Sequence, residues 1–326
     1  MAAESSPNPP PGTLDESPEK AVEPSFLDEM AEIGRWLLAN PVATGILLLI
    51  AGLMVYFFGF LEVFVNHTMS TYTWAMRAWN PEGNQEHGRL VPFIALGLMW
   101  IHRDRIRAAT IRGDNLGLIP LAIGLFCFLI SVRCVQPRFA IMSVPFLFYG
   151  SILFVCGREV ARVALFPSLF LFFMVPVAAL EQATFDLQFI ITGLVGALSK
   201  LFGIGIQAMG TTLTATDGAF NFEIAEGCSG IRSLAAMTML TAAYVYLTQD
   251  RFWKQAVIFL CSVGFAIIGN VGRIFTVVLV AKYYDPEFAS GLYHDYSGYV
   301  FFPIAVVAML AFARLVNFNS GKKKAA

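Results

Sequence analysis

Cys228 is the residue of this chain whose type and neighbours best suit covalent chemistry. It lies in the run EGCSG from Glu226 to Gly230, directly before an apolar stretch that begins at Ile231. This position predicts the first turn of a helix, where unpaired backbone N–H groups and the helix dipole lower the pKa of a thiol and stabilise an oxyanion. Gly227 and Gly230 let the backbone of a substrate approach closely. On spacing alone, an ordinary cysteine at a helix start explains the pattern equally well.

Arg273 and His294 supply the other groups that acyl transfer needs. Arg273 falls inside the apolar stretch Phe265–Val280, where an ionisable side chain is costly and usually faces a cavity or a partner. The alternative is an arginine that snorkels outward or pairs with an acidic neighbour. His294 lies between the last two apolar stretches, on the same side of the membrane as Cys228. A thiolate, a proton donor and a positive group for the oxyanion together make acyl transfer possible.

Four further polar residues are expected to line a substrate site around this centre. They are Arg232, Ser229, Asn270 and His87. His87 precedes an apolar stretch and is expected on the same outer side as Cys228. Arg232 lies only one turn from the outer surface, so a snorkelling side chain is the simpler explanation for it.

The composition predicts that membrane-spanning helices hold these residues. The 326-residue chain is 57% hydrophobic and only 14% charged, and its mean hydropathy of +0.65 is far above that of soluble domains. One span needs about 20 apolar residues. The stretches that reach or approach this length are Ala43–Val65, Leu90–Ile101, Leu116–Val132, Phe139–Cys156, Val163–Leu180, Ile231–Leu247, Trp253–Ala281 and Tyr299–Val316.

Charge and cysteine content exclude other classes of protein. The net charge of −1 gives no basic surface for nucleic acid. The five cysteines form no CxxC pair, and an odd number cannot all be joined within one chain. No metal or cofactor is expected at the site.

The distribution of Lys and Arg predicts the orientation. With the N-terminus in the cytoplasm, 14 of these residues fall in inner segments and six in outer ones. This places Cys228 at the outer end of a span. Phe185–Met209 is expected to be a re-entrant or interfacial helix, because a crossing there would move Arg251 and Lys254 to the outside.

A small outer β-hairpin is expected to lead into Cys228. Thr211–Thr216 and Ala219–Ile224 alternate in character around Asp217 and Gly218, a strong hairpin signal. The predicted fold is therefore an all-α polytopic membrane protein with about eight transmembrane helices, this hairpin and one interfacial helix. Residues 1–42 are expected to be a disordered cytoplasmic tail, 43–318 the transmembrane domain, and 319–326 a basic cytoplasmic tail.

At these motifs the chain resembles the exosortase and archaeosortase family of membrane cysteine transpeptidases. The resemblance rests on the Cys-Ser-Gly run at Cys228, the Asn-x-x-Arg run from Asn270 to Arg273, and the His-x-x-x-Gly run from His294 to Gly298. His87 with its following glycine supports it, as does the proline-containing stretch from Phe166 to Pro176, and the likeness covers roughly residues 90–312. Because the archaeal branch is expected to carry arginine where this chain has His294, the resemblance is to the bacterial exosortases.

The resemblance implies a protein-sorting enzyme in the cell inner membrane, with its active site on the extracytoplasmic face. Its partners would be the lipid bilayer and exported proteins that carry a PEP-CTERM-like C-terminal signal, made of a short motif, a transmembrane helix and a basic tail. The enzyme would cleave near the motif and pass the new C-terminus to an unknown acceptor. Cys228 would be the nucleophile, Arg273 the oxyanion or substrate-positioning group, and His294 the general acid and base.

Two other functions remain open from the sequence. One is a transporter or a non-enzymatic component of polysaccharide export, in which Arg273 and Arg232 line a solute path. The other is a membrane peptidase that simply hydrolyses its thioester, since no residue identifies the acceptor.

Overall fold

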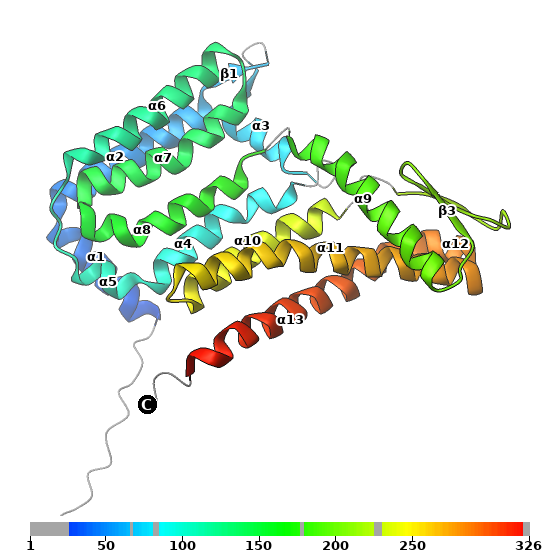
Figure 1. Cartoon of the computed structure of the whole chain (residues 1–326). Helices are drawn as coiled ribbons and strands as arrows, with labels where there is room; N and C mark the ends of the chain where they lie inside the picture. The colour runs from blue at the N-terminus through cyan, green and yellow to red at the C-terminus, as the bar shows by residue number, and fades with distance from the viewer. Residues whose placement is uncertain (1–25, 66–67, 81–84, 177–178, 225–229, 322–326) are drawn as a thin grey trace, which may run out of the picture. The chain divides into compact units, whose positions relative to one another are not determined.

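The computed structural model describes residues 26–65, 68–80, 85–176, 179–224 and 230–321 (Figure 1). The chain divides into two units, Met1–Thr44 and Gly45–Ala326. In the first unit, residues 26–39 of the expected N-terminal tail form helix α1 (Phe26–Ala39). Helix α2 (Pro41–Met54) begins there and continues into the second unit. All further elements belong to the second unit.

Long helices make up most of the second unit, as expected for an all-α membrane protein. Among the described residues, six helical stretches are long and apolar enough to cross a membrane, with α4 as a shorter apolar helix. The predicted count of about eight is not confirmed. The helices of this unit are α3 (Thr71–Ala78), α4 (Val91–Ile101), α5 (Arg103–Ala108), α6 (Leu118–Arg133), α7 (Pro137–Cys156), α8 (Arg158–Phe170), α9 (Ala179–Leu201), α10 (Ile231–Thr248), α11 (Phe252–Tyr283), α12 (Pro286–Phe288) and α13 (His294–Gly321).

One expected span, Val163–Leu180, is wrong in its bounds. Helix α8 ends at Phe170, a 3-10 turn covers Leu171–Met174, and the next helix begins at Ala179. Val175 has extended backbone angles (φ −74°, ψ 119°). The reason is Pro176, whose ring disfavours helical angles in the residue before it.

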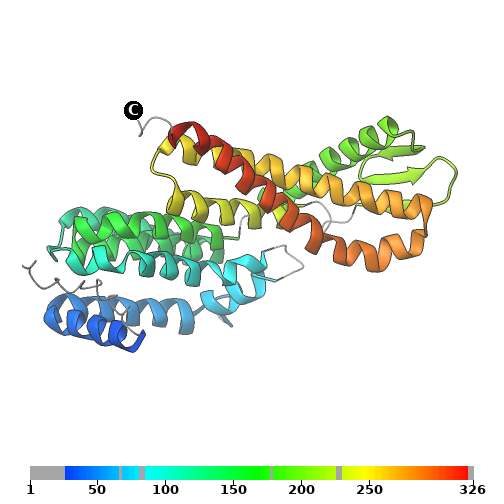
Figure 2. The same ribbon diagram turned by 90° about the horizontal axis from the view of Figure 1, so that it is seen from below.

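The two ends of the helical bundle differ in character. At one end, here called the basic end, Arg158 pairs with Asp114, and Lys254 donates a hydrogen bond of 2.7 Å to Asn317. At the other, here called the site end, the Trp79 indole donates to the Met174 carbonyl over 2.8 Å. Helix α13, red in Figure 2, lies along α11 between these two ends.

Helix α11 is longer than a membrane is thick. Its 32 residues extend about 48 Å, whereas the hydrocarbon core measures about 30 Å. The neighbouring α10 has only 18 residues, so the C-terminal part of α11 extends beyond the N-terminal end of α10. Helix α9 packs on that part through Ile191 and Val195, which share a hydrophobic core with Val278 (Figure 1).

A three-stranded antiparallel sheet lies with α9 against the same part of α11. Its order is β3 (Ile206–Met209), β4 (Thr212–Ala215) and β5 (Asn221–Glu223). The predicted hairpin is confirmed: Gly218 has φ +72° in the β4–β5 turn, and Asp217 beside it pairs with Lys282. Strand β3 was not predicted and corrects the expectation of a helix as far as Met209.

The first predicted span also ends earlier than expected. Helix α2 passes into a π-helical turn, Val55–Phe60, and the chain becomes extended at Leu61. Strands β1 (Glu62–Phe64) and β2 (Met69–Ser70) then pair in a second, two-stranded sheet. The residues as far as Val65 therefore do not continue the helix.

Candidate functional site

Arg273 joins the two longest helices of the second unit. Its Nε donates to the Ser297 hydroxyl over 3.1 Å, and its Nη2 donates to the backbone carbonyl of His294 over 3.0 Å. Ser297 is buried. The charged side chain therefore has polar partners at the beginning of α13, as expected for an ionisable group within a long apolar helix.

The position of Arg273 along α11 matches one membrane thickness. It lies 21 residues after Phe252, about 32 Å along the helix axis. Counting back from Asn317 at the basic end, Ser297 lies 20 residues away on α13, about 30 Å. Arg273 and Ser297 therefore both lie about 30 Å from the basic end, which is the thickness of the hydrocarbon core of a membrane.

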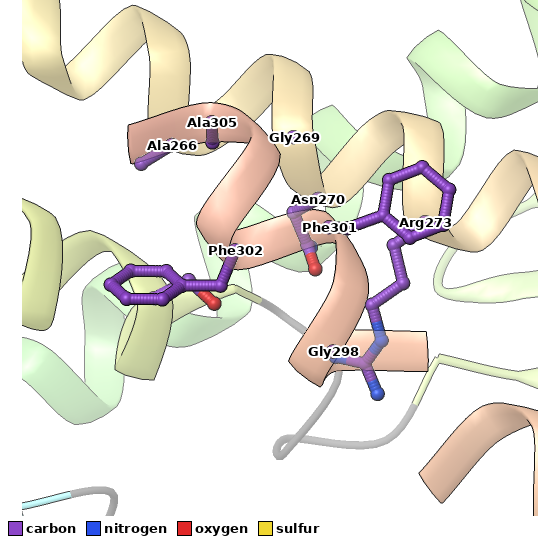
Figure 3. A pocket seen from close by; sticks show the side chains of 9 residues that line it. Ala266, Gly269, Asn270, Arg273, Gly298, Phe301, Phe302 and Ala305 are labelled. Atoms are coloured by element: carbon purple, nitrogen blue, oxygen red, sulfur yellow. The ribbon is translucent and has the colours of Figure 1, made fainter. Parts of the chain in front are cut away.

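Asn270 lies one turn before Arg273 and faces the same narrow space. Figure 3 shows the Arg273 side chain extending from α11 towards Gly298 on α13, with Asn270 beside it. These residues line a cavity of about 10 Å³, together with Phe301 and Phe302. That volume holds about one water molecule. The space between the helices is therefore nearly filled, and Asn270 is 4% exposed.

Gly230 brings the start of α10 against Asn270. Its φ of +81° is in the left-handed region that glycine tolerates, and a Cβ there would lie 2.6 Å from Asn270 Nδ2. The two backbones approach closely because this residue has no side chain. Gly230 follows Cys228 by two residues in the sequence.

Substituting Gly230 with alanine is expected to destabilise the protein more than a matched change at Gly218. Both residues have positive φ, but the space around Gly218 is open, so Gly218→Ala carries only the backbone cost of about 1–2 kcal/mol. Gly230→Ala adds the collision with Asn270. Thermal unfolding in detergent measures both variants, and equal unfolding temperatures would contradict the close contact.

His294 begins α13 and forms one wall of a larger cavity. Its Nδ1 lies 3.1 Å from Asp295 Oδ1. The cavity has a volume of about 260 Å³ and is lined by His294 and residues of β5, α11 and the segment before α13, including Glu223, Ile274 and Ser290. The contact between Arg273 and His294 is made through the histidine backbone.

His87 lies on the short connection before α4, and Arg232, in the first turn of α10, lies next to that connection. Arg232 Nε is 3.3 Å from Glu86 Oε1, which joins the start of α10 to the 3-10 turn Glu86–Arg89. Burial lowers the pKa of His87 below its ordinary value, and the Glu86 carboxylate and the backbone of Phe173 offset this only in part. This lowered pKa favours the neutral form of the His87 imidazole.

Cys228 and Ser229 lie outside the described residues, but the chain on both sides of them is placed. Before them, the Ile224 carbonyl accepts a hydrogen bond of 3.0 Å from the Gln188 side chain. After them, Gly230 rests on Asn270. The described residues that flank this segment, Ile224 and Gly230, therefore contact α9 and α11 respectively.

The structure also adds residues that the sequence motifs did not identify. Glu86 is the ionic partner of Arg232, and Ser297 is a hydrogen-bond partner of Arg273. Glu86 adjoins His87 in the sequence, and Ser297 directly precedes Gly298 of the His-x-x-x-Gly run. Their closeness to these motifs in the sequence was the only indication that they belong to the site. Which arginine each of them contacts depends on how the helices pack.

Comparison with known proteins gives one match. A family described as transmembrane exosortase matches residues 79–311, which is most of the chain and includes every site residue named above. No curated protein and no solved structure matches the chain.

Proposed function

The chain belongs to the transmembrane exosortase family, and on that premise we propose that it is a membrane cysteine transpeptidase with Cys228 as its nucleophile. Its substrates are exported proteins with a C-terminal signal made of a short motif, a membrane helix and a basic tail. The enzyme cleaves near the motif and transfers the new C-terminus to an acceptor.

One observation carries this proposal more than the others. Gly230, two residues after Cys228, lies against Asn270, and Arg273 one turn further along α11 is hydrogen-bonded to the first turn of α13, which begins at His294. The residue that follows the proposed nucleophile by two positions, the cation and the helix turn that carries the general acid thereby lie towards one level of the bundle. That is the set of groups that acyl transfer requires.

The reaction uses each residue in turn. The Cys228 thiolate attacks the scissile carbonyl carbon, and the Arg273 guanidinium stabilises the negative oxygen of the tetrahedral intermediate. His294 gives a proton to the leaving amine, and the C–N bond breaks to leave a thioester on Cys228. The acceptor nucleophile then attacks the thioester, His294 takes its proton, and the Cys228 thiolate leaves.

Basic residues support an extracytoplasmic site in the cell inner membrane. Arg103, Arg105 and Arg107 lie in α5, Arg158 begins α8, and Lys254 lies in the first turn of α11, all at the basic end. Positively charged segments favour the cytoplasm, so the site end faces outward. Helix α9 has the length and composition of a span, but its packing on the far part of α11 supports a position at or beyond the outer interface.

The substrate-binding residues are Arg232, Ser229, Asn270 and His87. His87, whose lowered pKa favours the neutral imidazole, contributes hydrogen bonds. Arg232 lies at the outer end of α10 and is half-exposed beside Glu86. The membrane helix of the substrate enters sideways between the spans, so the bilayer itself orients the scissile bond.

The function is tested with a reporter in proteoliposomes that contain the purified full chain. The reporter is a folded secreted domain fused to the C-terminal motif, helix and basic tail of an exported protein. We expect mass spectrometry to find a reporter that has lost its helix and tail and gained the mass of an amine at its new C-terminus. A free carboxylate there would identify a peptidase, and an intact reporter would refute the proposal.

A further inference from the structure

Strand β5 has one backbone edge that β4 does not use. The Phe220 carbonyl accepts from the Ala215 N–H over 3.0 Å, and the Ile224 N–H donates to the Thr211 carbonyl over 2.8 Å. Because alternate residues of an antiparallel strand bond to the same neighbour, the N–H and C=O groups of Asn221 and Glu223 point away from β4. Among the described residues the sheet order is β3-β4-β5, so this is an outer edge there, and both residues are exposed.

The cavity of about 260 Å³ runs along this edge. All four consecutive residues from Asn221 to Ile224 line it, although side chains in a strand alternate between the two faces. A space touched by four successive residues therefore reaches the edge of the strand as well as the face of the sheet, where Leu213 of β4 also lines it. Its opposite wall is apolar and is formed by Ile274, Val277 and Val278 of α11.

His294 lines the same cavity. A molecule that fills this cavity therefore also contacts His294, which donates and accepts the proton in the proposed reaction. The edge of β5 offers the backbone donors and acceptors that an extended polypeptide pairs with. The wall from α11 offers an apolar surface for every second side chain of such a strand.

We propose that the extended stretch of the substrate next to its scissile bond binds as a fourth strand on the free edge of β5. This inference rests on the proposed function and specifies how the substrate is held. Backbone hydrogen bonds to Asn221 and Glu223 provide sequence-independent affinity. The side chains that face Ile274, Val277 and Val278 provide the selection, so apolar residues are preferred at alternate positions of the substrate.

The backbone pairing is tested by two substitutions at one residue. Glu223→Ala and Glu223→Pro both remove the carboxylate, but only proline removes the N–H at the free edge, and proline is tolerated where that N–H does not bond within the sheet. We expect the full-length Glu223→Pro protein to process the reporter about tenfold more slowly than Glu223→Ala, through a higher KM, because the paired backbone bond is lost. Equal rates for two folded variants would overturn the proposal.

Disulfide scanning tests the same strand without relying on catalysis or on the folding of the proline variant. The full-length chain for this experiment carries Cys228→Ser and Glu223→Cys, and its four other cysteines are replaced by alanine. It is combined with reporters that carry a single cysteine at successive positions beside the motif. We expect cross-links at alternate positions, because neighbouring side chains of a paired strand face opposite sides. Cross-links at every position, or at none, would overturn the proposal.

The two hypotheses fail in different ways. If Cys228→Ser leaves processing intact while the cross-links alternate, the proposed nucleophile is wrong and the strand pairing stands. If Cys228→Ser abolishes processing while the cross-links do not alternate, the substrate reaches the nucleophile by another route and the strand pairing is wrong.

Discussion

Replacing Cys228 with serine is expected to slow processing of the reporter by about a thousandfold or more. A thiol ionises far more readily than a serine hydroxyl, which has no comparable route to its anion near neutral pH. Cys228→Ala removes the nucleophile altogether and is expected to have at least the same effect. Single-turnover appearance of the shortened reporter in proteoliposomes measures both.

Cys134 provides a matched control for this experiment. It is an exposed free cysteine that follows α6 at the end away from Arg158, so Cys134→Ser is expected to process the reporter at the wild-type rate. In the Cys228→Ser protein, a membrane-impermeant maleimide is expected to label Cys134 in intact spheroplasts, which verifies insertion and orientation. Labelling of Cys134 only after lysis would show that the protein has the opposite orientation in the membrane. Normal processing by Cys228→Ala would instead favour a transporter or a component of polysaccharide export.

Local features of the fold were predictable from the sequence because short-range chemistry determines them. Asp217 and Gly218 lie in the turn between β4 and β5, where Gly218 adopts the positive φ that such a turn needs. The stretch from Phe252 to Tyr283 forms one continuous helix, close to the span expected there. Pro176 was visible in the sequence, but the broken helix before it was not inferred, because apolar length alone does not reveal a local break.

The contacts of the candidate site were less predictable for a physical reason. Arg273 and His294 were expected on the same side of the membrane, since both follow from topology. That Arg273 bonds the backbone of His294 and the Ser297 hydroxyl depends on the rotation and crossing of α11 and α13. Those quantities are set by packing over many residues, including the close approach at Gly269, where a Cβ would meet Ala305. No local motif encodes them.

Replacing Arg273 with lysine is expected to reduce the rate constant of processing about a hundredfold or more, as does the loss of one oxyanion donor in other acyl-transfer sites. The guanidinium has five N–H groups in a planar fork, so it is able to bond α13 and still present donors to a developing oxyanion. A lysine ammonium keeps the charge but cannot reproduce that geometry. The expected change is in kcat rather than KM, because the oxyanion exists only in the transition state and the intermediate.

Ser297→Ala separates this role from a merely structural one. The substitution removes the hydroxyl that accepts from Arg273 Nε but leaves the guanidinium and its bond to the His294 carbonyl, so kcat is expected to fall less than about tenfold. If Arg273 served only to tie α11 to α13, Arg273→Lys would lower the thermal unfolding temperature and kcat together, and added guanidinium would restore neither in Arg273→Ala. If it stabilises the oxyanion, Arg273→Lys unfolds near the wild-type temperature, and guanidinium partly restores turnover by Arg273→Ala.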